Sequence, residues 1–119
     1  MYRVLSVSRN IHLSLERNNV LTMAGFSVMS PLYPEQASTL AMQERADAVV
    51  IGHSVEPSVR ESIIQEVRQL CPKCVICFVY AAPDTAGEPL ADISLDVTKG
   101  PEPLVVVLQE WLPKTIRAA

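Results

Sequence analysis

Few residues of this chain have side chains that are typical of catalytic centres, and His53 is the first to consider. It follows Gly52 at the end of an apolar run, where an imidazole could act as a general base or as a metal ligand. No acidic residue is placed by the sequence to orient the ring. We therefore interpret His53 as a hydrogen-bonded loop residue and predict neither a catalytic residue nor enzyme activity.

Three cysteines, Cys71, Cys74 and Cys77, have the C-x2-C-x2-C spacing of iron–sulfur ligands. A fourth cysteine is lacking, and Cys77 lies inside an apolar run. Two residues three positions apart on one strand point to opposite faces of a sheet, so Cys74 and Cys77 could not share a cluster there. We predict small buried side chains, no metal and no cofactor, with a redox pair of Cys71 and Cys74 as the alternative.

Composition limits the classes of protein that need be considered. The chain has 119 residues, 49% of them hydrophobic and 19% charged, with a net charge of −3, which predicts one globular domain over residues 1–119. The basic residues are scattered, so direct nucleic-acid binding is not expected. Apolar stretches too short for a membrane span and the lack of a signal peptide favour a cytoplasmic protein.

Hydrophobic periodicity predicts the elements that position these residues. Apolar runs of strand type cover residues 4–7, 26–29, 46–51 and 74–80, and an alternating run covers 93–97. Helical patterns cover residues 10–24, 35–45, 57–70 and 101–112. Between the last two strands, Pro83, Gly87 and Pro89 argue against a helix.

Two of the helical patterns are defined by apolar residues at helical spacing. The first shows an imperfect helical spacing and is ended by Gly25; its spaced residues are Leu13, Arg17, Val20, Leu21 and Ala24. The last helix is expected to end at Pro113, and its predicted buried residues are Leu104, Val105, Leu108, Trp111 and Leu112. Trp111 is thus expected to be a core residue.

The order of the elements predicts an α/β fold in three layers. Strands that alternate with helices form a parallel sheet covered on both faces. Right-handed crossovers then favour a doubly wound, five-stranded, flavodoxin-like sheet with strand order 2-1-3-4-5. The strongly apolar runs 46–51 and 74–80 take central positions, and runs 26–29 and 93–97 form the edges. A functional site is expected where the strands end.

The layout resembles the receiver domain of two-component response regulators from Arg3 to about Leu112. Residues 4–7 are similar to the family's first strand, Gly25-Phe26 to the pair after its first helix, and 46–51 to the strand that leads to the phospho-accepting aspartate. The resemblance implies a role in signal transduction, with a kinase, a response regulator or an output domain as the protein partner, and a possible homodimer.

Several positions depart from what that resemblance implies. The acidic pair that binds Mg²⁺ corresponds to Ser8 and Arg9, and the phospho-accepting aspartate corresponds to Gly52. Val79-Tyr80 stands where a serine or threonine closes the fourth strand, and either Lys99 or Val97 takes the place of the family's lysine. The chain is therefore expected to be a degenerate receiver without phosphoryl chemistry.

The altered strand ends define a candidate pocket, which we expect to be lined by Arg9, Gly52, His53, Tyr80 and Lys99. Arg9 could fill the former metal position or bind an anion. An open alternative is that Glu56 or Asp84 restores a cation site. The predicted function is phosphorylation-independent protein–protein interaction, and the alternative is a small-molecule or anion-binding regulatory module. Whether the domain stands alone or belongs to a longer chain is left open.

Overall fold

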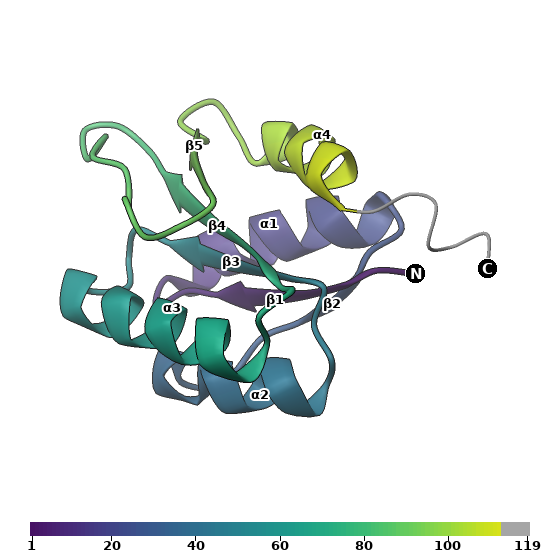
Figure 1. The fold of residues 1–119 in the computed structure, drawn as a ribbon. Helices are drawn as coiled ribbons and strands as arrows, with labels where there is room; N and C mark the ends of the chain where they lie inside the picture. Colours follow the sequence, from purple (N-terminus) through teal and green to yellow (C-terminus); the bar gives the residue numbers. More distant parts are fainter. Residues whose placement is uncertain (113–119) are drawn as a thin grey trace.

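A five-stranded sheet forms the centre of the computed structural model, which describes residues 1–112 (Figure 1). Its strand order is β2-β1-β3-β4-β5, and every neighbouring pair is parallel. The strands are β1 (Arg3–Val7), β2 (Ser27–Met29), β3 (Ala48–Gly52), β4 (Val75–Tyr80) and β5 (Ile93–Asp96). The predicted order 2-1-3-4-5 and the three-layer α/β class are confirmed.

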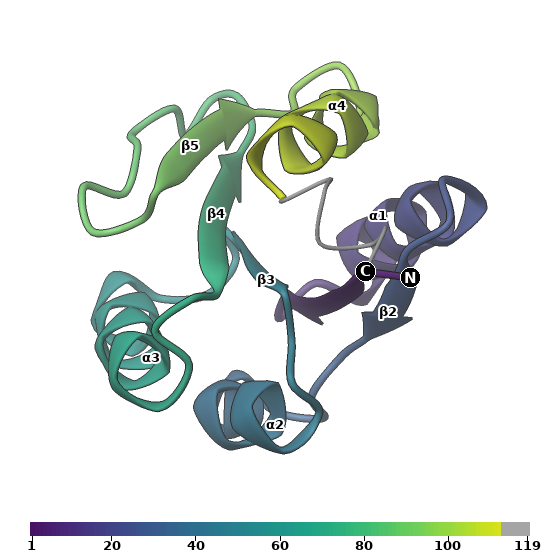
Figure 2. The ribbon, with the colours of Figure 1, turned by 45° about the vertical axis from the view of Figure 1, so that its right-hand side comes forward.

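Helices cover both faces of this sheet, two on each side (Figures 1 and 2). One face is covered by α1 (Ile11–Met23) and α4 (Glu102–Trp111). The other is covered by α2 (Ala37–Gln43) and α3 (Pro57–Leu70). The second predicted helix, residues 35–45, forms as a 3-10 turn, Pro34–Gln36, followed by the shorter α2. None of the helices described within residues 1–112 has the length and apolarity that a bilayer crossing requires.

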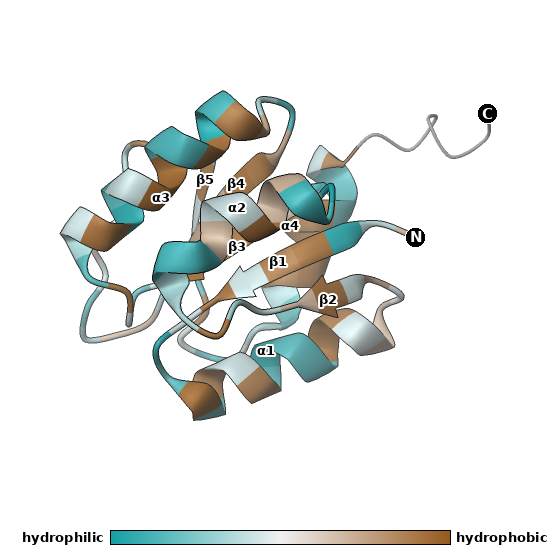
Figure 3. Ribbon diagram, turned by 90° about the horizontal axis from the view of Figure 1, so that it is seen from below, coloured by the Kyte–Doolittle hydropathy of each residue, from teal (hydrophilic) through white to brown (hydrophobic). Residues whose placement is uncertain are grey.

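Strand alternation divides the core into two layers. Leu5 and Val7 of β1 point towards α2 and α3, whereas Val4 points towards α1 and α4. All five residues of β3 are buried because helices lie on both sides of it. In Figure 3, β1 and β4 are mostly hydrophobic in colour, whereas α1 and α3 alternate between hydrophobic and hydrophilic residues. Ser6 of β1 is also buried, on the α1 side.

Both ends of α1 are fixed by local hydrogen bonds. Asn10 caps the first turn, where its side-chain oxygen accepts from the backbone N–H groups of His12 and Leu13 at 3.0 and 3.1 Å. Gly25 has a φ of +97°, which favours glycine, and the backbone N–H of Phe26 donates to the carbonyl of Leu21 at 3.1 Å. The predicted helix end at Gly25 is confirmed, and α1 starts directly at the carboxyl edge of the sheet.

The connection between β4 and β5 contains no helix over residues 81–92, as the sequence predicts. Asp92 holds its end in place, because its carboxylate accepts from the backbone N–H of Ile76 at 2.7 Å and pairs with Arg68 at 2.9 Å. β5 is a half-exposed edge strand in which Ile93 and Leu95 are the more buried residues. The predictions of a connection without a helix and of a half-exposed edge strand are therefore both confirmed.

Trp111 is not a core residue, and that prediction is wrong. Its side chain is 50% exposed, whereas Leu104, Leu108 and Leu112 are buried at intervals of four residues. Successive residues of a helix differ by about 100° in direction, so the position before Leu112 turns away from this stripe. The predicted helix end at Pro113 lies outside the described residues.

Cys77 lies on the opposite face of the sheet from Cys71 and Cys74. Cys74 is buried on the α3 side of the sheet and Cys77 on the α1 side, in agreement with the prediction of small buried side chains on opposite faces. Burial raises the pKa of both thiols, that of Cys77 to about 12, so both stay protonated at neutral pH. Cys71 is half-buried beside the layer that contains Cys74.

Candidate functional site

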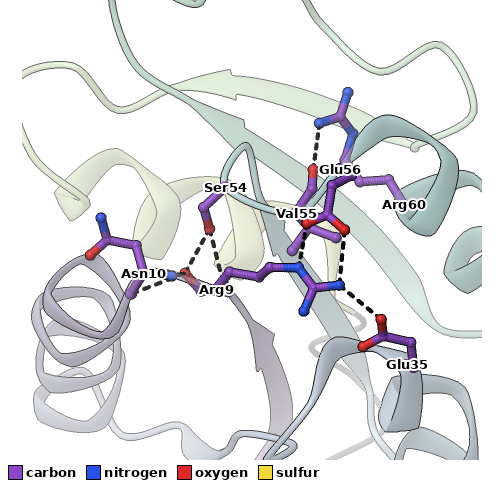
Figure 4. Close-up of polar contacts among 8 residues, drawn as sticks. Arg9, Asn10, Glu35, Ser54, Val55, Glu56 and Arg60 are labelled. Atoms are coloured by element: carbon purple, nitrogen blue, oxygen red, sulfur yellow. Dashed lines mark hydrogen bonds and ion pairs between the residues drawn. The ribbon is translucent and has the colours of Figure 1, made fainter.

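The loops after β1 and β3 are joined at the carboxyl edge of the sheet. The hydroxyl oxygens of Ser8 and Ser54 lie 3.1 Å apart, and the backbone N–H of Arg9 donates to Ser54 at 2.9 Å. The backbone N–H of Asn10 donates to the Ser8 hydroxyl at 3.0 Å. Figure 4 shows Ser54 above the backbone of Arg9 and Asn10. Ser8 and Ser54 thus link the start of α1 to the segment that leads into α3.

Arg9 extends from this edge to two glutamates (Figure 4). Its Nη2 lies 2.8 Å from a carboxylate oxygen of Glu35 and 3.0 Å from one of Glu56, and its Nε donates to the other Glu56 oxygen. These hydrogen bonds lower the pKa of both carboxyl groups, and donation to Glu56, followed by donation to Glu35, raises the pKa of Arg9. The predicted strand-end arginine is therefore held by carboxylates.

The residues at this edge do not fit a Mg²⁺ site. A hard cation needs several oxygen ligands, usually including carboxylates. Ser8 supplies a hydroxyl group, Arg9 supplies a positive charge, and Glu56 is engaged by the guanidinium. Asp84 lies in the β4–β5 connection, in a bridge with Ala81. Within residues 1–112, no three His, Cys, Asp or Glu side chains are grouped to hold a metal ion.

Arg9→Gln is expected to raise the pKa of both Glu35 and Glu56. Glutamine keeps a polar side chain but removes the positive charge and the bidentate hydrogen bonds that favour the ionised carboxylates. Side-chain carboxyl resonances followed by NMR during an acid titration measure both pKa values. Arg68→Gln, which changes an arginine away from this edge, serves as the control. Unchanged values in Arg9→Gln would show that the ion pairs do not persist in solution.

The end of β3 is occupied by the side chain of Arg17 from α1. A Cβ atom at Gly52 would lie 2.6 Å from Nη2 of Arg17, which is too close for any residue other than glycine unless the guanidinium moves. Arg17 is only 5% exposed, and its Nη1 donates to the Ser6 hydroxyl at 3.1 Å and to the Val7 carbonyl at 3.2 Å. A cation therefore lies where the resemblance places the phospho-accepting carboxylate.

Arg17 is buried without a counter-charge. In the part of the chain that the structure describes, no carboxylate forms an ion pair with it, and only Nη1 makes hydrogen bonds. Burial lowers the pKa of its guanidinium to about 10, which still leaves it charged at neutral pH. Buried arginines are normally paired, so this arrangement is unusual. Arg17 is part of a helical spacing in the sequence, but its burial at the end of β3 was not predicted.

The structure separates the residues predicted to line one pocket. His53 and Lys99 lie together with Arg17 around a cavity of about 260 Å³ beside Gly52, between α1 and the segment after β5. Val97 lines the same cavity, so both candidates for the family's lysine position are found there. Of the other three predicted lining residues, Gly52 lies against Arg17 and is not part of the lining, and Arg9 and Tyr80 lie elsewhere. Arg9 is turned towards its glutamates, and Tyr80 stacks on Phe78, which packs under Arg60 of α3.

Known proteins resemble this chain in structure rather than in sequence. No protein-family model and no curated protein matches it. A response regulator receiver domain protein from Clostridium thermocellum superposes with a TM-score of 0.82 over 100% of both chains, at 11% identity. A chemotaxis response regulator of Vibrio cholerae gives 0.77 at 21% identity, over 94% of this chain and 99% of its own.

A third solved structure is a response regulator of Thermotoga maritima in complex with Mg²⁺ and BeF, with a TM-score of 0.80, 16% identity and coverage of 94% and 100%. This chain has the receiver-domain fold. The resemblance to receiver domains that was inferred from the sequence is therefore confirmed for the fold.

Proposed function

We propose that this chain acts in signal transduction as a receiver-like module whose protein interactions do not depend on phosphorylation. The observation that carries the proposal is the guanidinium of Arg17 at the end of β3, next to a glycine that offers no nucleophile. Phosphoryl transfer to a protein carboxylate needs that carboxylate and a divalent cation to neutralise the phosphoryl charge. Here the strand end provides neither group.

The surface of α4 supports an interaction role. Trp111 and Val106 are 50% and 54% exposed, and on the neighbouring helix α1 Ile11 and Leu15 are 68% and 56% exposed. These exposed apolar side chains are available for contact with another protein. The proposed partner is another signalling protein, such as a kinase, a response regulator or an output domain, or a second copy of this chain. The proposed role is binding and includes no catalytic step.

No covalent phosphate is expected when the purified protein is incubated with a small-molecule phosphodonor and Mg²⁺. The intact mass should stay unchanged, because Gly52 has no side chain and Arg9 and Arg17 place positive charges where metal and nucleophile would be needed. A conventional receiver treated in parallel is the positive control. A native mass spectrum of the same untreated sample reports self-association. An added phosphate on the protein would overturn phosphorylation independence.

A small-molecule or anion-binding regulatory module is the second candidate function. The observation that favours it is the buried guanidinium of Arg17, whose positive charge is not balanced by any residue of the described chain. The supporting site differs from the pocket expected from the sequence, since it is formed by the α1 face of the sheet. It is compatible with the interaction role, because no residue of α4 is among the residues that line the cavity.

A further inference from the structure

The cavity beside Gly52 combines buried positive charge with an apolar wall. Its volume is about 260 Å³, below the roughly 300–1,000 Å³ that holds drug-sized ligands, so it suits a small metabolite. The basic lining residues are Arg17 and Lys99, and the acidic one is Glu16. The lining of described residues therefore has an excess of positive charge.

Arg17 has hydrogen-bond donors left for a ligand. Nη1 is engaged by Ser6 and Val7, whereas Nε and Nη2 donate to no residue of the described chain. A guanidinium presents its donors in a planar fork that matches the two oxygens of a carboxylate. Nη2 lies against Gly52, which has no side chain to displace it, and Arg17 is among the residues that line the cavity.

The rest of the lining selects among anions. Leu13 of α1, Val79 of β4 and Val97 after β5 supply aliphatic surface on the same cavity. Inorganic oxyanions have no apolar part and gain nothing from such a surface, whereas the hydrocarbon part of an organic acid does. The combination of a buried guanidinium with aliphatic walls is suited to an amphipathic anion.

We propose that this cavity binds a small organic carboxylate, with its oxygens on the Arg17 guanidinium and its hydrocarbon part against Leu13, Val79 and Val97. Lys99 lies at the same cavity and adds a second positive charge that attracts the anion. The ligand would supply the counter-charge that the protein does not. This inference develops the second candidate function and does not depend on the protein-interaction role.

Butyrate is the probe for the test, titrated into ¹⁵N-labelled protein at constant ionic strength. We expect saturable chemical-shift changes at the backbone amides of Arg17, His53 and Lys99. Butylammonium has a chain of the same length with the opposite charge and should cause none. Inorganic phosphate should bind more weakly than butyrate. Phosphate binding at least as tight as that of butyrate would overturn the assignment to organic carboxylates, and the lack of any saturable change would overturn the site itself.

Arg17→Met is expected to weaken butyrate binding at least tenfold, because charge-assisted hydrogen bonds are lost. Arg9→Met is the matched control, since it removes the same charge from the same edge outside the cavity, and it should bind as the parent does. Lys99 is exposed, so Lys99→Ala should not affect folding. This substitution is expected to weaken butyrate binding several-fold. Equal affinity in Arg17→Met and the parent, or equal loss in Arg9→Met, would overturn the proposal. Neither result would affect the proposed protein-interaction role, because phosphorylation and self-association are tested separately by mass spectrometry.

Discussion

Replacing Arg17 with methionine is expected to raise the free energy of unfolding by about 1–3 kcal/mol. The lowering of its pKa to about 10 corresponds to roughly 3 kcal/mol of unfavourable free energy for the buried charge. Methionine has a flexible side chain that can fill much of the same space without a charge. The gain is reduced by the hydrogen bonds that Ser6 and Val7 lose.

Urea denaturation of the parent and Arg17→Met measures this difference. Arg9→Met provides the comparison with an exposed arginine, for which little change is expected because surface ion pairs contribute little and are screened by salt. A variant that gains stability and loses anion binding would show that the buried charge is retained for a ligand. A less stable Arg17→Met would instead show that the guanidinium supports the fold through its contacts with β1.

The second large effect is expected from a pair of substitutions at one position. Gly52→Asp should be more stable than Gly52→Asn by about 1.5–3 kcal/mol, the range for hydrogen bonds to charged groups. Both side chains have nearly the same shape, and both require the end of Arg17 to shift, since a Cβ atom there would lie 2.6 Å from Nη2. Only the aspartate supplies the negative charge that the guanidinium lacks.

The pH dependence of this pair identifies its cause. The guanidinium would lower the pKa of the introduced carboxyl group, so its contribution to stability is present at neutral pH and is lost as the pH falls through that lowered value. Thermal unfolding of both variants between neutral and acidic pH follows the difference. Equal stability of the two variants at neutral pH would contradict the unpaired state of Arg17. Gly52→Asp is still expected to take up no phosphate, because Ser8 and Arg9 provide no metal site.

The fold could be predicted from the sequence because its signals are local. Apolar runs such as 46–51 become strands covered on both faces, and Gly25 ends α1 through a conformation that favours glycine. The prolines between β4 and β5 correctly predicted the lack of a helix there. Trp111 was assigned wrongly because five apolar positions shared one helix, and only the packing of α4 on the sheet decides which of them face the core.

The site was harder to predict from the sequence, because it depends on where the charged ends of long side chains lie in the folded structure. Arg17 was visible as a charged residue between Leu13 and Leu21, at intervals of four on one helix face, and that spacing is the signal that could have revealed a buried cation. Tyr80 and Lys99 both follow the strand ends in sequence, yet strand alternation turns Tyr80 to the α3 side of the sheet. No local pattern indicated the contact between Arg9 and Glu35, which depends on how the loops are placed.

The strand order also has a consequence for how the chain folds during synthesis. All four strand pairs described within residues 1–112 are parallel, so none of them forms as a local hairpin, and the contact of β1 with β3 already joins Val4 to Ala48. From β1 outwards, however, β3, β4 and β5 lie side by side in the order in which a ribosome makes them. Each new strand can add to an edge that already exists. The sheet can therefore grow in the direction of translation without displacing a strand that has already paired.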